Sequence, residues 1–171
     1  MDTLEQFTRS LQGTAEEPSL VFERRYRSSP QDLWDAITTP ERLARWFGAF
    51  EGNPPAAVGD DFRVDLGGGA EDMGRGTITA CKSPVHLSYT WQWQNEDLSQ
   101  VTADLAPDGD QTVLHLTHSK VEPAHVVGYG GGWEQCMLAL DDELTGTNTY
   151  QSHFQNHETA ANSIWLELQN S

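Results

Sequence analysis

The spacing of hydrophobic positions changes from a period of two to a helical period and back again along the chain. Residues 20–26 alternate and predict a strand. Two short helical stripes follow, and each begins with a hydroxyl side chain before a proline, first at Ser29 and then at Thr39. Alternation returns after a proline-containing loop at 52–59 and continues to His118. The pattern predicts one strand, two short helices that depend on tertiary packing, and then a run of strands.

The second alternating region divides into five consecutive strands joined by short polar connections. Glycine and proline mark turns at 67–69 and 107–110. Gly74 and Gly76 lie within the strand expected over 73–82, where they indicate a bend or a bulge. Consecutive strands with short connections favour an antiparallel meander with one apolar face.

Helical spacing returns near the C-terminal end of the chain. It predicts a long helix over 133–144, whose apolar stripe consists of Trp133, Cys136, Met137, Leu140 and Leu144. The preceding segment, 123–132, is interpreted as a loop or a short broken helix. Within it, Gly130–Gly132 would be a flexible entry to the helix or a gate at the mouth of a pocket.

Both ends of the chain differ in character from the middle. We divide it into an N-terminal extension (1–19) with a possible short helix, a domain (20–145) and a polar C-terminal tail (146–171). Leu4, Phe7 and Leu11 have the spacing of a short amphipathic helix. The tail is expected to have low order up to an apolar segment at 164–168. That segment would dock on the domain, or on a second copy to form a homodimer.

Composition excludes several classes of partner. The formal net charge is −16, from 10 Lys and Arg against 26 Asp and Glu, and residues 121–171 contain no Lys or Arg. A chain so poor in basic side chains is a weak candidate for binding nucleic acid or an anionic membrane. It lacks an apolar run long enough to span a bilayer and an apolar leader, so we expect a cytoplasmic protein without membrane insertion. The two cysteines, Cys81 and Cys136, are interpreted as buried thiols in a reducing compartment.

Several distinct local motifs lie within residues 20–145. They are Phe22-x-Arg24-x-Tyr26, Ser29-Pro30-x-x-Leu33-Trp34, Pro40-Glu41-x-Leu43-x-x-Trp46-Phe47, Tyr89-Thr90-Trp91, Leu114-His115-Leu116-Thr117-His118 and Gly132-Trp133. In these motifs the chain resembles the family of homologues of the activator of the heat-shock-protein-ninety ATPase. That family belongs to the helix-grip superfamily, with START lipid-transfer domains, the birch-pollen allergen and polyketide cyclases.

The resemblance implies an α+β fold. A curved antiparallel sheet of about six or seven strands would wrap around the long C-terminal helix, with two short helices after the first strand. A curved sheet that grips one helix leaves a space between them, where a ligand pocket can form.

Tryptophan-rich segments supply the walls of this predicted cavity. Its lining is predicted to be Trp46, Phe47, Phe62, Trp91, Trp93, Trp133 and Met137. Arg24 and His118 share the inward-facing parity of their strands and are candidate polar anchors. The alternatives are a structural ion pair for Arg24 and a hydrogen-bonded core imidazole for His118.

We favour binding of a small apolar or aromatic molecule, without catalysis and without a cofactor. A second hypothesis is a cyclase- or hydrolase-type enzyme that uses His118 or a nearby acid as general acid or base. A third is a co-chaperone-like interaction domain. His115 and His118 are three apart on a strand and point to opposite faces, so they cannot share a metal. His153 and His157 have the i, i+4 spacing that can hold zinc, but no further ligand motif accompanies them, and no metal site is predicted.

Overall fold

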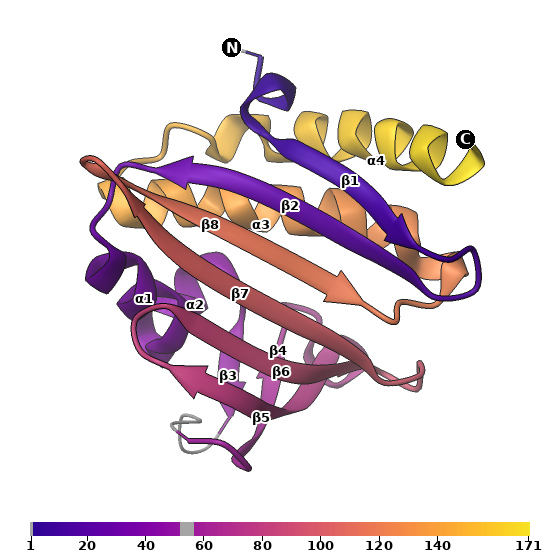
Figure 1. The fold of residues 1–171 in the computed structure, drawn as a ribbon, viewed down its shortest axis with the longest axis horizontal. Helices are drawn as coiled ribbons and strands as arrows, with labels where there is room; N and C mark the ends of the chain where they lie inside the picture. The colour runs from indigo at the N-terminus through magenta and orange to yellow at the C-terminus, as the bar shows by residue number, and fades with distance from the viewer. Residues whose placement is uncertain (1, 52–56) are drawn as a thin grey trace.

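The computed structural model describes residues 2–51 and 57–171, which form a single eight-stranded antiparallel sheet with helices packed on its concave face (Figure 1). The strand order is β1-β2-β8-β7-β6-β5-β4-β3. The strands are β1 (Thr8–Gly13), β2 (Pro18–Tyr26), β3 (Ala49–Glu51), β4 (Asp61–Asp65), β5 (Met73–Lys82), β6 (His86–Trp93), β7 (Ser99–Asp108) and β8 (Gln111–Ser119). The helices are α1 (Pro30–Thr38), α2 (Pro40–Trp46), α3 (Val126–Thr145) and α4 (Phe154–Asn170). Short 3-10 turns occur at Leu4–Gln6, Gly69–Glu71, Pro123–His125 and Gln151–His153.

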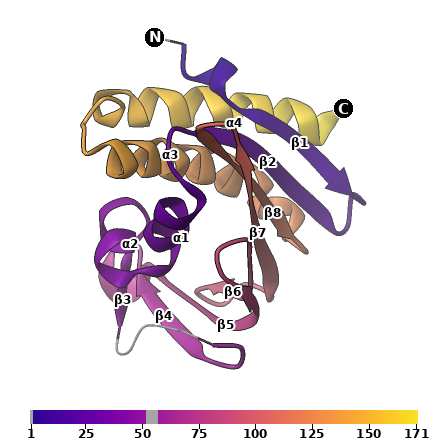
Figure 2. The same cartoon turned by 60° about the vertical axis from the view of Figure 1, so that its left-hand side comes forward.

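The predicted fold class is confirmed. A curved antiparallel sheet encloses the long helix α3, and α1 and α2 follow β2 (Figure 2). The sheet has eight strands rather than six or seven, because β1 and β3 extend its two edges. Ser29 caps α1 as predicted, since its hydroxyl accepts a hydrogen bond from the Asp32 backbone N–H at 3.1 Å. Thr39 precedes α2 without a side-chain cap.

The N-terminal segment is a strand and not the amphipathic helix that its apolar spacing predicted. Only residues 4–6 form a helical turn, and β1 then pairs with β2 from Thr8↔Glu23 to Gly13↔Pro18. Gly13 turns the chain with a φ of +80°, a conformation that glycine adopts readily. The edge of β2 satisfies the backbone groups of this segment, a contact that local sequence does not encode.

The glycines at 130–132 lie inside a helix and not in a loop or gate, which corrects the prediction. Helix α3 begins at Val126, seven residues before the predicted start. A Cβ atom at Gly130 would lie 2.3 Å from Cγ of Trp165, and one at Gly131 would lie 1.9 Å from Oδ1 of Asn162. The missing side chains therefore allow α4 to approach α3 closely.

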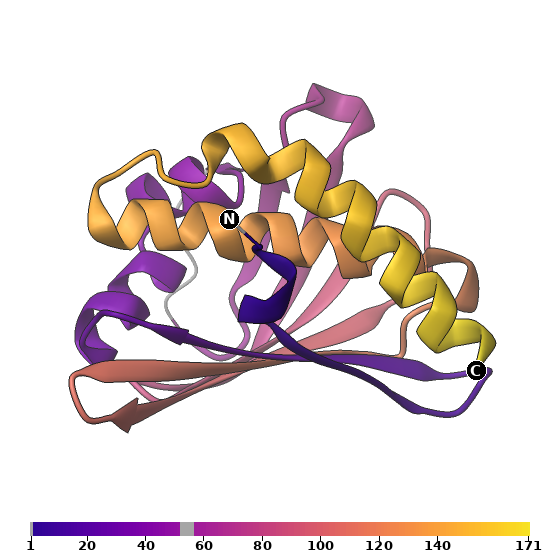
Figure 3. The same ribbon diagram turned by 90° about the horizontal axis from the view of Figure 1, so that it is seen from above.

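The expected polar tail of low order is instead the ordered helix α4. Figure 3 shows α4 running obliquely along α3, with its C-terminal half directed toward the β1 edge of the sheet. Trp165 is fully buried, where its ring contacts Phe22 and its Nε1 donates to Oε2 of Glu134 at 2.7 Å. The apolar segment thus docks on its own domain, and a homodimer stays a prediction.

The cysteines differ from their predicted burial. Cys81 is exposed near the end of β5, and Cys136 on α3 is partly buried. Both thiols are free. Burial raises the pKa of the Cys136 thiol to about 12, so this group stays protonated and unreactive near neutral pH.

Candidate functional site

An apolar cavity of about 390 Å³ lies between the concave face of the sheet, α1 and α2 on one side, and α3. Figure 2 shows the elements that enclose it. Five of the predicted wall residues line this cavity, which we call cavity 1: Trp46, Phe47, Phe62, Trp133 and Met137. Side chains that the prediction did not include complete the walls, among them Trp34, Leu43, Phe50, Ile78, Leu87, Tyr89, Ala103, Leu114 and Leu140.

The polar atoms of cavity 1 are few and neutral. The polar lining side chains are Thr38, Thr39, Cys81, Ser83 and Tyr89, and no charged side chain is among the described lining residues. Burial raises the pKa of Tyr89, so its hydroxyl remains a neutral group that can donate a hydrogen bond.

Trp91 and Trp93, the other two predicted wall residues, line a second cavity of about 540 Å³, which we call cavity 2. Phe47 and Trp133 line both cavities, with ring centroids 5.8 Å apart and planes inclined by 18°. This stacked pair forms a shared wall. The sequence pattern predicted one cavity, and the structure divides its residues between two.

A chain of hydrogen bonds connects residues in the wall of cavity 2. Trp91 Nε1 donates to the Tyr129 hydroxyl at 3.0 Å, and that hydroxyl donates to Oε1 of Glu96. The backbone N–H of Trp93 also donates to Glu96 Oε1, at 3.0 Å. Burial and the neighbouring Glu96 carboxylate raise the pKa of Tyr129, so its hydroxyl stays protonated. Nδ1 of His125 lies 2.9 Å from the other Glu96 oxygen.

Two more carboxylates complete the lining of cavity 2. Asp72 accepts a hydrogen bond from Trp93 Nε1 at 2.8 Å. Glu158 reaches the cavity from α4. No sequence pattern singled out Asp72, Glu96, Tyr129 or Glu158. Tyr129 was missed because 123–132 was interpreted as irregular, and Glu158 because the tail was expected to lack order.

His118 lies in the core and outside the described lining of both cavities. It is fully buried, with Nε2 at 2.7 Å from Ser99 Oγ, and Trp133 Nε1 donates to its Nδ1 at 3.0 Å. Since Nδ1 accepts, the proton of the neutral ring is on Nε2. Burial lowers the pKa of His118 to about 3, so the ring is neutral near pH 7. It is a hydrogen-bonded core imidazole that holds Trp133 in place.

Arg24 is an ion-paired core residue and is not among the described residues that line either cavity. Its side chain is 3% exposed, and its Nη2 lies 2.7 Å from Oδ2 of Asp141 on α3. The guanidinium also lies over the Phe7 ring, 4.6 Å from the centroid. The ion pair connects β2 to α3.

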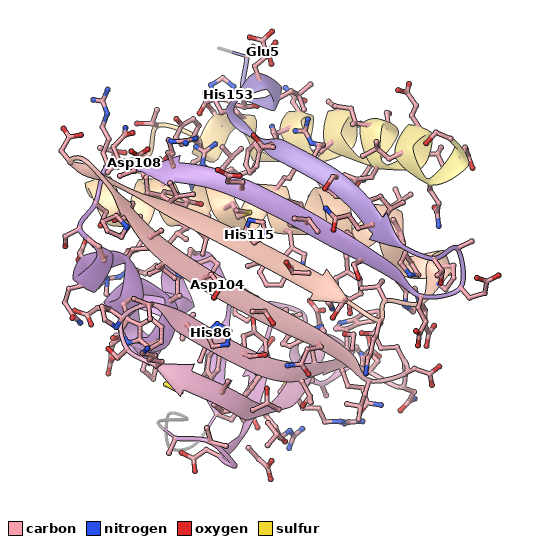
Figure 4. All side chains as sticks on the ribbon, viewed as in Figure 1. Glu5, His86, Asp104, Asp108, His115 and His153 are labelled. Carbon is pink, nitrogen blue, oxygen red and sulfur yellow. The ribbon has the colours of Figure 1, made fainter. Side chains whose placement is uncertain are left out.

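The remaining histidines do not form a metal site in the described part of the chain. Figure 4 shows His86, Asp104 and His115 in a row on the outer face of the sheet, opposite to His118. His157 is buried with Nε2 at 3.0 Å from Oε1 of Glu134, so its role is to join α4 to α3. Among the described residues, no three His, Cys, Asp or Glu side chains converge into a metal-binding group. No helix in that part of the chain is long and apolar enough to cross a bilayer.

Comparison with known proteins identifies relatives of this fold. Residues 27–145 match the family described as Activator of Hsp90 ATPase homolog 1-like protein. No curated protein matches the chain.

Solved structures resemble the chain over most or all of its length. CalU16 from Micromonospora echinospora is 25% identical with a TM-score of 0.79, and the alignment covers 96% of this chain and 99% of CalU16. MLL2253 from Mesorhizobium loti is 30% identical with a TM-score of 0.67, over 75% of this chain and 98% of MLL2253. DynU16, a protein in the dynemicin biosynthetic locus, is 23% identical with a TM-score of 0.68, over 75% of this chain and 48% of DynU16. Because the family match covers more than half of the sequence, the chain belongs to the Activator of Hsp90 ATPase homolog 1-like family.

Proposed function

We propose that this protein binds a small hydrophobic or aromatic ligand in cavity 1. The observation that carries the proposal is an apolar space of about 390 Å³ between the sheet, α1, α2 and α3. Protein interiors are otherwise close-packed, and pockets of about 300–1,000 Å³ with mostly apolar walls are typical of small-molecule sites. Aromatic walls at Trp46, Phe47 and Phe62 favour a flat, unsaturated ligand.

The geometry favours binding over catalysis by His118. A general base needs a free lone pair within reach of the substrate, and both ring nitrogens of His118 have partners in the core. The Cys136 thiol stays protonated because burial raises its pKa. These two groups therefore support a binding protein and not an acid–base or nucleophilic enzyme.

Filling cavity 1 tests the proposal. Ala103 lines the cavity from β7, while Ala106 on the same strand is exposed. An Ala103→Leu variant should abolish binding of neutral 2-naphthylmethanol, measured by calorimetry and by tryptophan fluorescence, while its circular dichroism spectrum stays native. The matched Ala106→Leu variant should bind like the wild type.

Wild-type affinity in a folded Ala103→Leu variant would contradict the assignment of cavity 1. Native mass spectrometry of the purified protein gives an independent test, since a natural ligand should add a discrete mass that Ala103→Leu removes.

A further inference from the structure

We propose that cavity 2 is a separate site for an organic cation, a protonated or quaternary amine that carries an apolar or aromatic group. This goes beyond the proposed function and does not depend on it. The inference comes from a combination in one cavity of about 540 Å³: aromatic rings together with carboxylates from three separate segments of the chain.

Five aromatic side chains line the cavity. They are Phe47, Trp91, Trp93, Tyr129 and Trp133. The faces of such rings are electron-rich and attract ammonium groups, most strongly for tryptophan. All three indole N–H groups are already hydrogen-bonded: that of Trp91 to Tyr129, that of Trp93 to Asp72 and that of Trp133 to His118. These rings are therefore held in place before a ligand arrives.

The charge of the wall is negative and has no permanent cation beside it. Asp72, Glu96 and Glu158 line the cavity, and none of its described lining residues is Lys or Arg. His125 is the one basic side chain there, and it is charged only if protonated. Residues 121–171, which supply α3 and α4, contain no Lys or Arg at all.

Glu96 is the deepest of these acids. Its side chain is 4% exposed, and neutral donors, the Tyr129 hydroxyl and the Trp93 backbone N–H, hold one carboxylate oxygen. A buried carboxylate normally has an Arg or Lys partner, because an unpaired charge is costly in the interior. Here the second carboxylate oxygen faces Nδ1 of His125 at 2.9 Å, a side chain that is charged only if protonated, and no Lys or Arg is among the described lining residues. A cation supplied by the ligand would provide the permanent positive charge.

The spacing of the acids favours an organic cation over a metal ion. Asp72 precedes β5, Glu96 follows β6 and Glu158 lies on α4. In the described part of the chain these groups do not converge into a set that could hold one metal ion. Dispersed carboxylates with aromatic faces between them fit a bulky ammonium group, which is bound without short inner-sphere contacts.

A pair of probes that differ mainly in charge tests the site. Calorimetry would compare 2-naphthylmethylammonium with neutral 2-naphthylmethanol at equal ionic strength. The ammonium probe should bind about tenfold tighter or better, since each factor of ten requires only about 1.4 kcal/mol. In ¹⁵N spectra it should shift the indole N–H signals of Trp91 and Trp93.

Matched charge variants locate the effect. Asp72→Asn and Glu158→Gln should each weaken binding of the ammonium probe about threefold or more. This change in affinity corresponds to the energy of one exposed ion pair. Glu167→Gln removes the same charge from an exposed position on the same helix α4 and should leave the affinity almost unchanged. Thermal melts of all three variants confirm that they fold.

The outcomes separate this inference from the function proposed for cavity 1. If Ala103→Leu blocks the alcohol but not the ammonium probe, the two cavities act as distinct sites. In Ala103→Leu, where cavity 1 is filled, an ammonium probe that binds no tighter than the alcohol would overturn the cation site. An equal loss of affinity for the ammonium probe in Glu158→Gln and Glu167→Gln would also overturn it, because it would indicate attraction by the overall negative charge. If only the alcohol fails to bind the wild-type protein, the cavity 1 proposal alone would be overturned.

Discussion

Alternation along a strand determines which side of the sheet a side chain faces. Its polar partners then determine its role. Alternation correctly placed His118 inside and His115 outside, because successive residues of a strand face opposite sides. Alternation also placed Arg24 inside, but it could not identify Asp141, which lies 117 residues away, as its partner. The sequence left two roles open for each of these residues, and long-range contacts selected the structural one.

Burial of His118 makes the stability of the fold depend on pH. Burial lowers its folded pKa to about 3 from an ordinary value of 6.5. Below pH 6.5 the unfolded chain therefore binds a proton that the folded chain rejects. Stability should fall as the pH decreases from about 6.5 toward 3, with a limiting slope of about 1.4 kcal/mol per pH unit from this group. Urea unfolding of the wild type between pH 7 and 4 measures this slope.

A His118→Gln variant separates this effect from other titrating groups. It should be less stable at pH 7, because the bonds to Ser99 and Trp133 change, but it should lose less stability on acidification. The same acid-induced loss in both proteins would contradict the assignment.

Among the secondary-structure elements, α3 and α4 pack together as one unit. Local sequence patterns did not predict this packing. Three consecutive glycines at 130–132 are unfavourable in an isolated helix. The structure keeps them helical because Trp165 and Asn162 of α4 occupy the space that side chains would take. Glu134 of α3 then accepts bonds from Trp165 of α4 and from Arg9 of β1, the latter through two nitrogens at 2.6 and 2.8 Å. This buried carboxylate joins both ends of the chain to α3.

One substitution at two neighbouring glycines tests the packing of α3 against α4. Gly130→Ala places its Cβ against Trp165 and should destabilise the protein by about 1–3 kcal/mol. Gly132→Ala meets nothing within 4 Å and should be neutral or stabilising by up to about 1 kcal/mol, the propensity difference between the two residues. Urea unfolding of both variants measures the contrast. Similar changes at both positions would mean that α4 does not pack as described.

Most charged side chains of the molecule lie on the outside, and most of its aromatic side chains lie inside. Arginines near the helices form ion pairs. Arg42, for example, lies 2.7 Å from Asp32 and 3.1 Å from Glu143. Acidic side chains outnumber basic ones, which gives the chain a formal net charge of −16. Repulsion among such charges destabilises the compact state and is screened by salt.

Added salt should therefore raise the melting temperature. Between about 10 and 200 mM NaCl the screening length falls from roughly 30 to less than 10 Å. For a chain of this size a gain of about 1 kcal/mol corresponds to roughly 2–4 °C. Differential scanning calorimetry across this range measures the shift, and a melting temperature that falls with salt would show that favourable ion pairs outweigh the repulsion.

Local sequence specifies the strands β2 and β4–β8, the Ser29 cap of α1 and the fold family, because hydrophobic period, proline and glycine act over a few residues. It also singled out seven of the residues that line the two cavities, but it missed others, such as Tyr89 and Tyr129. Local sequence does not indicate that residues 8–13 form a strand or that 126–132 and 154–170 are helical. Nor does it indicate that Phe47 and Trp133 separate an apolar cavity from an acidic one. Those features depend on contacts between segments far apart in the chain, where the partner's shape and charge outweigh local preference.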